Sequence, residues 1–122
     1  MNTYSFEKLD VWQKSKDFSV LIYRLTQKFP TEEKFGITNQ LRRASVSIAS
    51  NIAEGSSRSS FKDQARFSEI AYGSLVEVLN QLIISFELKY INSEDYHSSR
   101  IKIDEISNKL NSLKKSQLRR IN

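Results

Sequence analysis

Apolar side chains recur every three or four residues through most of this chain, which is the spacing of one face of an α-helix. Four stretches follow this spacing, and we predict a helix in each: about residues 9–28, 38–55, 60–90, and 93 into the C-terminal tail. Short connections between long amphipathic helices favour antiparallel neighbours. The pattern therefore predicts an all-α protein, an up-down-up-down antiparallel four-helix bundle, with residues 1–122 forming a single domain.

Capping and helix-breaking residues mark the ends of the predicted helices. Pro30 ends the first helix, and Thr31 is expected to cap a short acidic turn that follows it. Thr38 is a good N-cap for the second helix, Ser60 opens the third, and Ser93 begins the fourth. The chain has only three glycines and one proline, and it lacks β-branched runs bounded by turns, which also favours helices over strands.

The third predicted helix carries more apolar surface than one bundle needs. Ile70, Ile84 and Leu88 lie away from its main apolar stripe, where water would surround them in a monomer. The small residues Gly73 and Ser74 on the same side would let another backbone approach closely. These features predict self-association.

The second predicted helix carries a polar line opposite its apolar side. Its members mix hydrogen-bond donors, acceptors and groups that do both: Gln40, Arg43, Ser47, Asn51, Glu54 and Arg58. Together with Glu77 of the third helix, such a line can satisfy its own hydrogen bonds across a helix–helix or subunit contact and fix the register. A catalytic or base-reading site is the alternative, although buried polar networks are more often structural.

Positive charge gathers at the C-terminal end of the sequence. The formal net charge is +5, and residues 100–122 contain seven basic and two acidic side chains, which equals that whole excess. Such a tail suggests an anionic partner, and an ordinary solvated helix end is the alternative. The basic residues that we expect to contact nucleic acid are Lys114, Lys115, Arg119, Arg120, Lys109 and Arg42.

Three segments also resemble a known family. FEKLDVWQKS, QLRRASVSIASNIAEGSSR and AYGSLVEVLNQL, in this order and spacing, resemble the proteins encoded in intervening sequences of bacterial 23S ribosomal RNA genes, which are four-helix bundles. That family is similar to the accessory protein of diversity-generating retroelements, a basic bundle that binds nucleic acid and partners a reverse transcriptase. The resemblance implies a closed homopentamer. The residue pattern typical of the family falls, in this chain, on Gln40, Arg42, Arg43, Ser47, Asn51, Glu54, Gly55, Gly73, Ser74 and Glu77.

We therefore expect a non-enzymatic homo-oligomer that binds RNA or another nucleic acid and is ribosome-associated. The alternative is an adaptor for a protein such as a reverse transcriptase. The chain has no cysteine and no apolar run of signal-peptide or membrane-spanning length, which favours a cytoplasmic protein. A role on the membrane surface is disfavoured because every apolar stripe is expected to be core.

Other candidate chemistry is weak, and no metal or cofactor is expected. Glu94 and His97 have the Glu-x-x-His spacing of di-iron bundles, but those sites need two such motifs and the chain has one histidine. The turn GSSRSS could hold a phosphate with Arg58 and Lys62, or its Ser59 or Ser60 could simply cap the next helix.

Nucleophilic catalysis is also disfavoured, because a serine nucleophile needs a histidine base and His97 is flanked by no nucleophile elbow. Trp12, Tyr4 and Tyr23 could stack on nucleic-acid bases. Trp12 and Tyr23 lie beside the core stripe of the first helix, so packing is the preferred interpretation for them.

Overall fold

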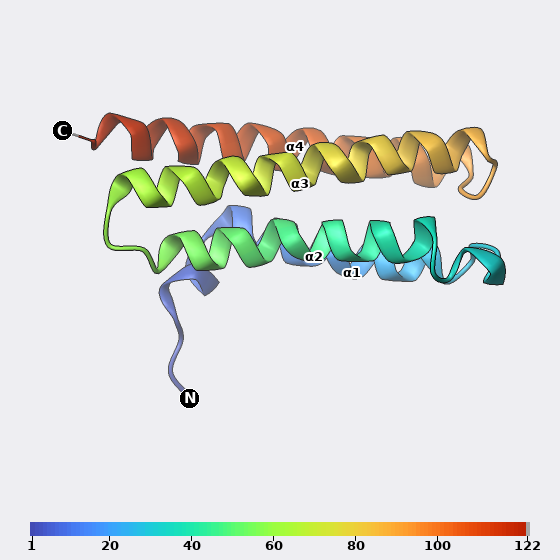
Figure 1. Cartoon of the computed structure of the whole chain (residues 1–122), viewed down its shortest axis with the longest axis horizontal. Helices are drawn as coiled ribbons and strands as arrows, with labels where there is room; N and C mark the ends of the chain where they lie inside the picture. The colour runs from blue at the N-terminus through green and yellow to red at the C-terminus, as the bar shows by residue number, and fades with distance from the viewer. Residues whose placement is uncertain (122) are drawn as a thin grey trace.

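The computed structural model describes residues 1–121 and consists of long helices packed side by side (Figure 1). The helices are α1 (Asp10–Thr26), α2 (Ile37–Ser56), α3 (Phe61–Glu87) and α4 (Ser93–Arg119), with 3₁₀ turns η1 (Ser5–Lys8) and η2 (Thr31–Glu33). Each helix packs against the next in sequence, and α1 also contacts α4. The predicted antiparallel four-helix bundle is therefore confirmed. Asn122, the last residue of the predicted domain, lies outside the described residues.

All four helices contribute to one apolar core. Each helix supplies core residues with at most 2% of their surface exposed, among them Phe18 and Ile22 of α1, Leu41 and Ile48 of α2, Leu75 and Leu82 of α3, and Ile106 and Leu110 of α4. These are positions of the predicted three- and four-residue spacing. Burying each such side chain contributes about 1.5–3 kcal/mol, so the stripes account for the bundle.

Small residues let neighbouring helices approach closely. The hydroxyl groups of Ser19 and Ser45 lie 3.2 Å apart in the buried contact between α1 and α2. Between α2 and α3, a Cβ atom added to Gly55 would lie only 2.8 Å from the Cβ of Phe67. Because a Cβ cannot rotate away, Gly55 allows a helix separation that no other residue would.

The predicted N-cap of α2 is wrong. Gly36, not Thr38, precedes the helix, and its carbonyl accepts the first helical hydrogen bond, from the Gln40 N–H at 3.1 Å. The Tyr90 hydroxyl donates to Glu33 Oε2 at 2.9 Å and so holds the turn before Gly36 against the end of α3. Thr38 is instead the second residue of α2 and is buried, and its hydroxyl has no hydrogen-bond partner within residues 1–121.

Two predicted helix starts are confirmed, while the predicted cap of the short turn is wrong. Helix α4 begins at Ser93 as predicted, and its N-cap is Asn92, whose Oδ1 accepts from the Asp95 N–H at 2.7 Å. Pro30, rather than Thr31, precedes η2, so Thr31 is the first residue of the turn and not its cap. Ser60 caps α3 as predicted, since its hydroxyl accepts from the Asp63 N–H at 3.1 Å.

Helix α3 ends at Glu87, three residues earlier than predicted. Lys89 follows with a φ of 63°, in the left-handed region. The Tyr90 N–H donates to the Ser85 carbonyl at 2.9 Å, and the Lys89 N–H donates to the Phe86 carbonyl at 3.0 Å. This pair of bonds is the Schellman motif, which satisfies the last carbonyls of a helix.

Candidate nucleic-acid interface

Positive charge is concentrated at one end of the bundle. The α2–α3 turn, the start of α3 and the end of α4 meet there, on the left of Figure 1. Residues 54–69 and 114–120, which we name the basic end, contain seven basic and three acidic side chains and so hold +4 of the net +5. At the opposite end, residues 24–34 and 87–100 contain five basic and five acidic side chains and so carry no net charge. The bundle is thus electrically asymmetric along its length.

Three of the predicted contact residues are available on this surface. Lys115, Arg119 and Arg120 are exposed at the end of α4. Within residues 1–121, Lys115 and Arg119 form no ion pair or side-chain hydrogen bond. The Arg120 guanidinium lies over the Phe61 ring, 5.5 Å from its centroid. These side chains can reach a phosphate without breaking an ion pair.

Two other predicted residues are engaged with carboxylates of the same chain. Lys114 Nζ lies 2.9 Å from Glu69 Oε1, and Lys109 Nζ lies 2.6 Å from Asp10 Oδ2. The hydrogen bond from Lys109 lowers the pKa of Asp10 and raises the pKa of Lys109 itself. Both lysines thus join helices in the bundle, and their charge is partly compensated.

The structure places Arg42 far from the basic end. Its Nε donates to the Thr26 hydroxyl at 2.9 Å, and its Nη2 donates to the Tyr23 carbonyl at 3.4 Å. Its guanidinium also lies 4.8 Å from the centroid of the Tyr23 ring. Arg42 therefore fastens the start of α2 to the end of α1 and is not brought together with the tail residues.

Arg66 was missed as an interface residue, and Lys62 was considered only as a phosphate ligand of the GSSRSS turn. Both are exposed on the first turns of α3, and they line a groove there together with Lys114 of α4. Nothing in the sequence around Arg66 marks it out. Once an antiparallel bundle is predicted, however, the start of the third helix must lie beside the end of the fourth, and that argument could have found them.

The turn GSSRSS shows the hydrogen bonds of an ordinary helix start. Besides the Ser60 cap, Gln64 Nε2 donates back to the Arg58 carbonyl at 2.9 Å. The Arg58 guanidinium lies 4.7 Å from the centroid of the Phe67 ring, and one of its nitrogens is 4.0 Å from Glu54 Oε2. The capping interpretation therefore accounts for these residues.

The polar line of α2 bonds across the contact with α3. The Ser47 and Ser74 hydroxyls lie 2.9 Å apart, and Asn51 Nδ2 donates to the Ser47 carbonyl at 2.8 Å and to its hydroxyl at 3.0 Å. Further along, Gln81 Nε2 lies 3.4 Å from Gln40 Oε1 and 3.4 Å from Glu77 Oε2. The line thus serves a helix–helix contact within one chain.

Arg43 does not take part in these bonds. It is exposed and forms no ion pair or side-chain hydrogen bond in the described part of the chain. Gln81 of α3 is 6% exposed, and the buried Oε1 of its amide has no hydrogen-bond partner in the described part of the chain.

A second apolar face of α3 is exposed in the single chain. Ile70, Ile84 and Leu88 have 41%, 43% and 49% of their surface exposed. A Cβ atom added to Gly73, on the same side, would meet no atom within 4 Å. Self-association through α3 requires such exposed apolar side chains and open space for a second backbone.

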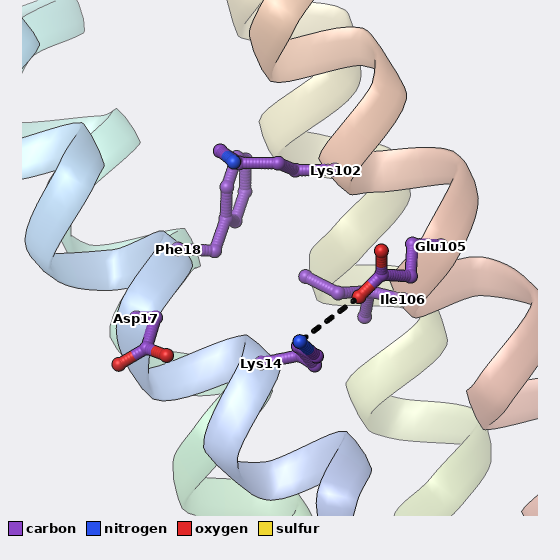
Figure 2. Close-up of a pocket in the computed structure, with 6 residues that line it drawn as sticks. All are labelled: Lys14, Asp17, Phe18, Lys102, Glu105 and Ile106. Atoms are coloured by element: carbon purple, nitrogen blue, oxygen red, sulfur yellow. Dashed lines mark ion pairs between the residues drawn. The ribbon is translucent and has the colours of Figure 1, made fainter.

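A small cavity lies between α1 and α4 (Figure 2). Its volume is about 170 Å³, and it is lined by Lys14, Asp17, Phe18, Lys102, Glu105 and Ile106. Lys14 and Glu105 form an ion pair of 3.7 Å across it, drawn as the dashed line, while the Asp17 carboxylate points away from them. Neither a hydroxyl nor an imidazole lines this cavity, so it does not provide the serine and histidine pair of nucleophilic catalysis.

The structure separates the aromatic candidates. Trp12 packs against the core as predicted, with its ring 4.9 Å from that of Phe6. Tyr4 and Tyr23 are exposed, so the packing interpretation is not confirmed for Tyr23. His97 Nδ1 lies 2.7 Å from the Ser93 carbonyl, one turn earlier in α4. In residues 1–121, His, Asp and Glu side chains form no group of three that could hold a metal ion.

None of the helices within residues 1–121 combines the length and the apolarity needed to cross a membrane.

The fold and the charge distribution define the class: a small four-helix bundle with one basic end. Residues 7–112 match the 23S rRNA-intervening sequence protein family, and the chain belongs to that family. A crystal structure from Bacteroides thetaiotaomicron, of a protein with unknown function from the S23 ribosomal protein family, is 29% identical with a TM-score of 0.78. The alignment covers 86% of this chain and 98% of that one. No curated protein matches the chain significantly.

The family match covers only part of the basic end. It stops at residue 112 and therefore does not include Lys114, Lys115, Arg119 or Arg120. The predicted resemblance is confirmed, and the four terminal basic residues are a feature of this chain outside the segment that matches the family.

Proposed function

We propose that this chain is a cytoplasmic, non-enzymatic homo-oligomer that binds RNA, or another nucleic acid, through the basic end of the bundle. The observation that carries the proposal is the placement of +4 of the net charge on three helix ends that meet. Phosphate contacts supply most of the sequence-independent affinity for nucleic acid, and they need cationic side chains that can reach the backbone. Lys115, Arg119 and Arg120 meet that need, because they are exposed.

The oligomer that we propose is a closed pentamer joined through the second apolar face of α3. The exposure of Ile70, Ile84 and Leu88 supports this, since apolar side chains gathered on one helix face gain from a partner surface. A ring of bundles would repeat the basic end. Several weak phosphate contacts on one particle then add through effective concentration.

The test replaces Lys115, Arg119 and Arg120 with Gln and measures RNA affinity as a function of salt. Lys114 is left in place, because its contact with Glu69 joins α3 to α4. For single strands the log–log salt slope is about −0.7 per neutralised phosphate, so three lost contacts should flatten it by about 2. The matched control changes Lys28, Lys34 and Lys89 to Gln, the same loss of charge at the opposite end.

The control variant should keep the wild-type slope and affinity, while the loss in the test variant should be similar for unrelated RNA sequences, because phosphate contacts do not read bases. Equal slopes for the two variants would contradict the proposal. Wild-type behaviour of the test variant would mean that the tail is an ordinary solvated helix end.

An adaptor for a protein such as a reverse transcriptase is the second candidate function. The exposed face of α3 favours it, because a patch of this kind also suits a protein partner. If the wild-type protein binds no nucleic acid even at low salt, the adaptor takes the place of the nucleic-acid proposal.

A further inference from the structure

The basic end contains an apolar groove as well as charge. The groove lies between the first turns of α3 and the last turns of α4, has a volume of about 360 Å³, and we name it the terminal groove. Its lining is Lys62, Ala65, Arg66, Glu69, Lys114, Leu118 and Ile121. Leu118 and Ile121 are 47% and 41% exposed, so water reaches the apolar part of the groove. Phosphate contacts alone would not need such a surface.

An aromatic ring stands beside the terminal groove. Phe61, the first residue of α3, is 38% exposed, and Arg120 from the end of α4 lies over its ring. Aromatic rings and guanidinium planes are the surfaces on which unpaired nucleic-acid bases stack. Phe61 and Arg120 therefore offer a base two kinds of stacking partner at one place.

The charges around the groove favour a polyanion. Lys62 and Arg66 are exposed on one side, and Arg120 lies beside Phe61. Glu69, the carboxylate in the lining, is held by Lys114 at 2.9 Å. The groove thus presents cationic side chains around exposed apolar atoms, and the Phe61 ring precedes it on α3.

From these features we infer that the terminal groove binds single-stranded nucleic acid, with one base stacked on Phe61 and the adjoining phosphates on Lys62 and Arg66. This inference rests on the proposed function and names its ligand class. A duplex keeps its bases stacked on each other and presents phosphates outward, so it can use the lysines and arginines but not Phe61 or the apolar side chains of Leu118 and Ile121. Single strands expose both features that the groove can bind.

The test uses the full chain and 12-nucleotide RNA strands carrying one 2-aminopurine, whose fluorescence falls when the base stacks. Binding to the wild-type protein should quench the fluorescence. Phe61→Ala should remove the quenching and weaken single-strand binding by about 5- to 100-fold, the usual loss for one stacking contact. Duplex affinity and the salt slope should not change, because no phosphate contact is lost.

Phe35→Ala is the matched control. Phe35 is 87% exposed in the turn before α2, at the opposite end of the bundle, so this variant loses an equally large exposed ring. It should bind and quench like the wild type. Phe61→Trp should also quench, because it keeps a stacking face, whereas Phe61→Leu keeps apolar bulk and should not.

The outcomes separate this inference from the proposed function. If Phe61→Ala binds and quenches like Phe35→Ala, while the Lys115, Arg119 and Arg120 variant still flattens the salt slope, the groove inference is overturned and the function stands. Equal wild-type affinity for duplex and single strand overturns it too. An acidic amphipathic peptide that occupies the groove while single strands bind without quenching would assign it to a protein partner.

Discussion

Lys89 adopts a backbone conformation that its side chain disfavours. Its φ of 63° is the only positive value outside glycine in the described chain, and it ends α3 in a Schellman motif. Left-handed backbone costs an L-residue about 1 kcal/mol, and glycine avoids that cost. We predict that Lys89→Gly raises the free energy of unfolding by about 0.5–1 kcal/mol, measured by urea denaturation.

Lys89→Ala is the control for that substitution, because alanine loses the lysine side chain but keeps its Cβ. It should show no such gain. If both variants are stabilised equally, the lysine side chain and not the left-handed backbone is the source of the effect.

At the scale of helices, repeated spacing was enough to predict all four elements and their core positions. The ends were less predictable, because they depend on contacts between elements. The hydrogen bond from Tyr90 to Glu33 shapes the turn at Gly36, and no local signal in that turn reveals it. The sequence offers both Gly36 and Thr38 as N-caps, and threonine and glycine have about the same intrinsic preference for that position, so propensity alone could not choose between them.

In the candidate interface, too, the local features were predictable from the sequence and the contacts between helices were not. The run of charge that ends in Arg119 and Arg120 is visible in the sequence, because it is local. That Lys114 and Lys109 would meet Glu69 and Asp10 depends on the register of helices far apart in sequence. The residues that share a surface with the tail could be found only after the bundle was assembled.

Two ion pairs cross the contact between α1 and α4, and the stability that one of them contributes should respond to pH. Lys109 lowers the pKa of Asp10 below its ordinary value of 3.8, mainly through their hydrogen bond. A carboxylate with a lowered pKa in the folded state stabilises it above the unfolded pKa and loses this effect as pH falls through the folded value. We predict that Asp10→Asn is less stable than the wild type near pH 7, and that the difference shrinks below 3.8.

Urea midpoints at about pH 7 and about pH 2 would measure this difference. Asp17→Asn is the control, because Asp17 is also an exposed carboxylate of α1 but pairs only with its neighbour Lys16. It should show little change at either pH. A gap between Asp10→Asn and wild type that persists undiminished at the lower pH would mean that the ion pair is not its cause.

For the whole molecule, the open space at Gly73 makes a clean test of the proposed assembly. Nothing lies within 4 Å of an added Cβ, so Gly73→Leu should leave the fold of one chain intact. If the second face of α3 joins subunits, the larger side chain should reduce the mass measured by light scattering while helicity by circular dichroism is unchanged.

Asn111→Leu adds the same side chain to an exposed position of α4 and should keep the wild-type mass. An unchanged mass for Gly73→Leu would show that this face is not an interface. A wild-type protein that is monomeric at micromolar concentration would contradict the proposed pentamer directly.

The uneven charge along the bundle also has a kinetic consequence. A helix of 27 residues such as α3 is about 40 Å long, which is about five Debye lengths at physiological ionic strength. An approaching polyanion therefore experiences the field of one end at a time, and only the basic end attracts it. This attraction turns the basic end of the bundle toward the polyanion before contact. Added salt should therefore lower the association rate constant far more than it changes the dissociation rate constant.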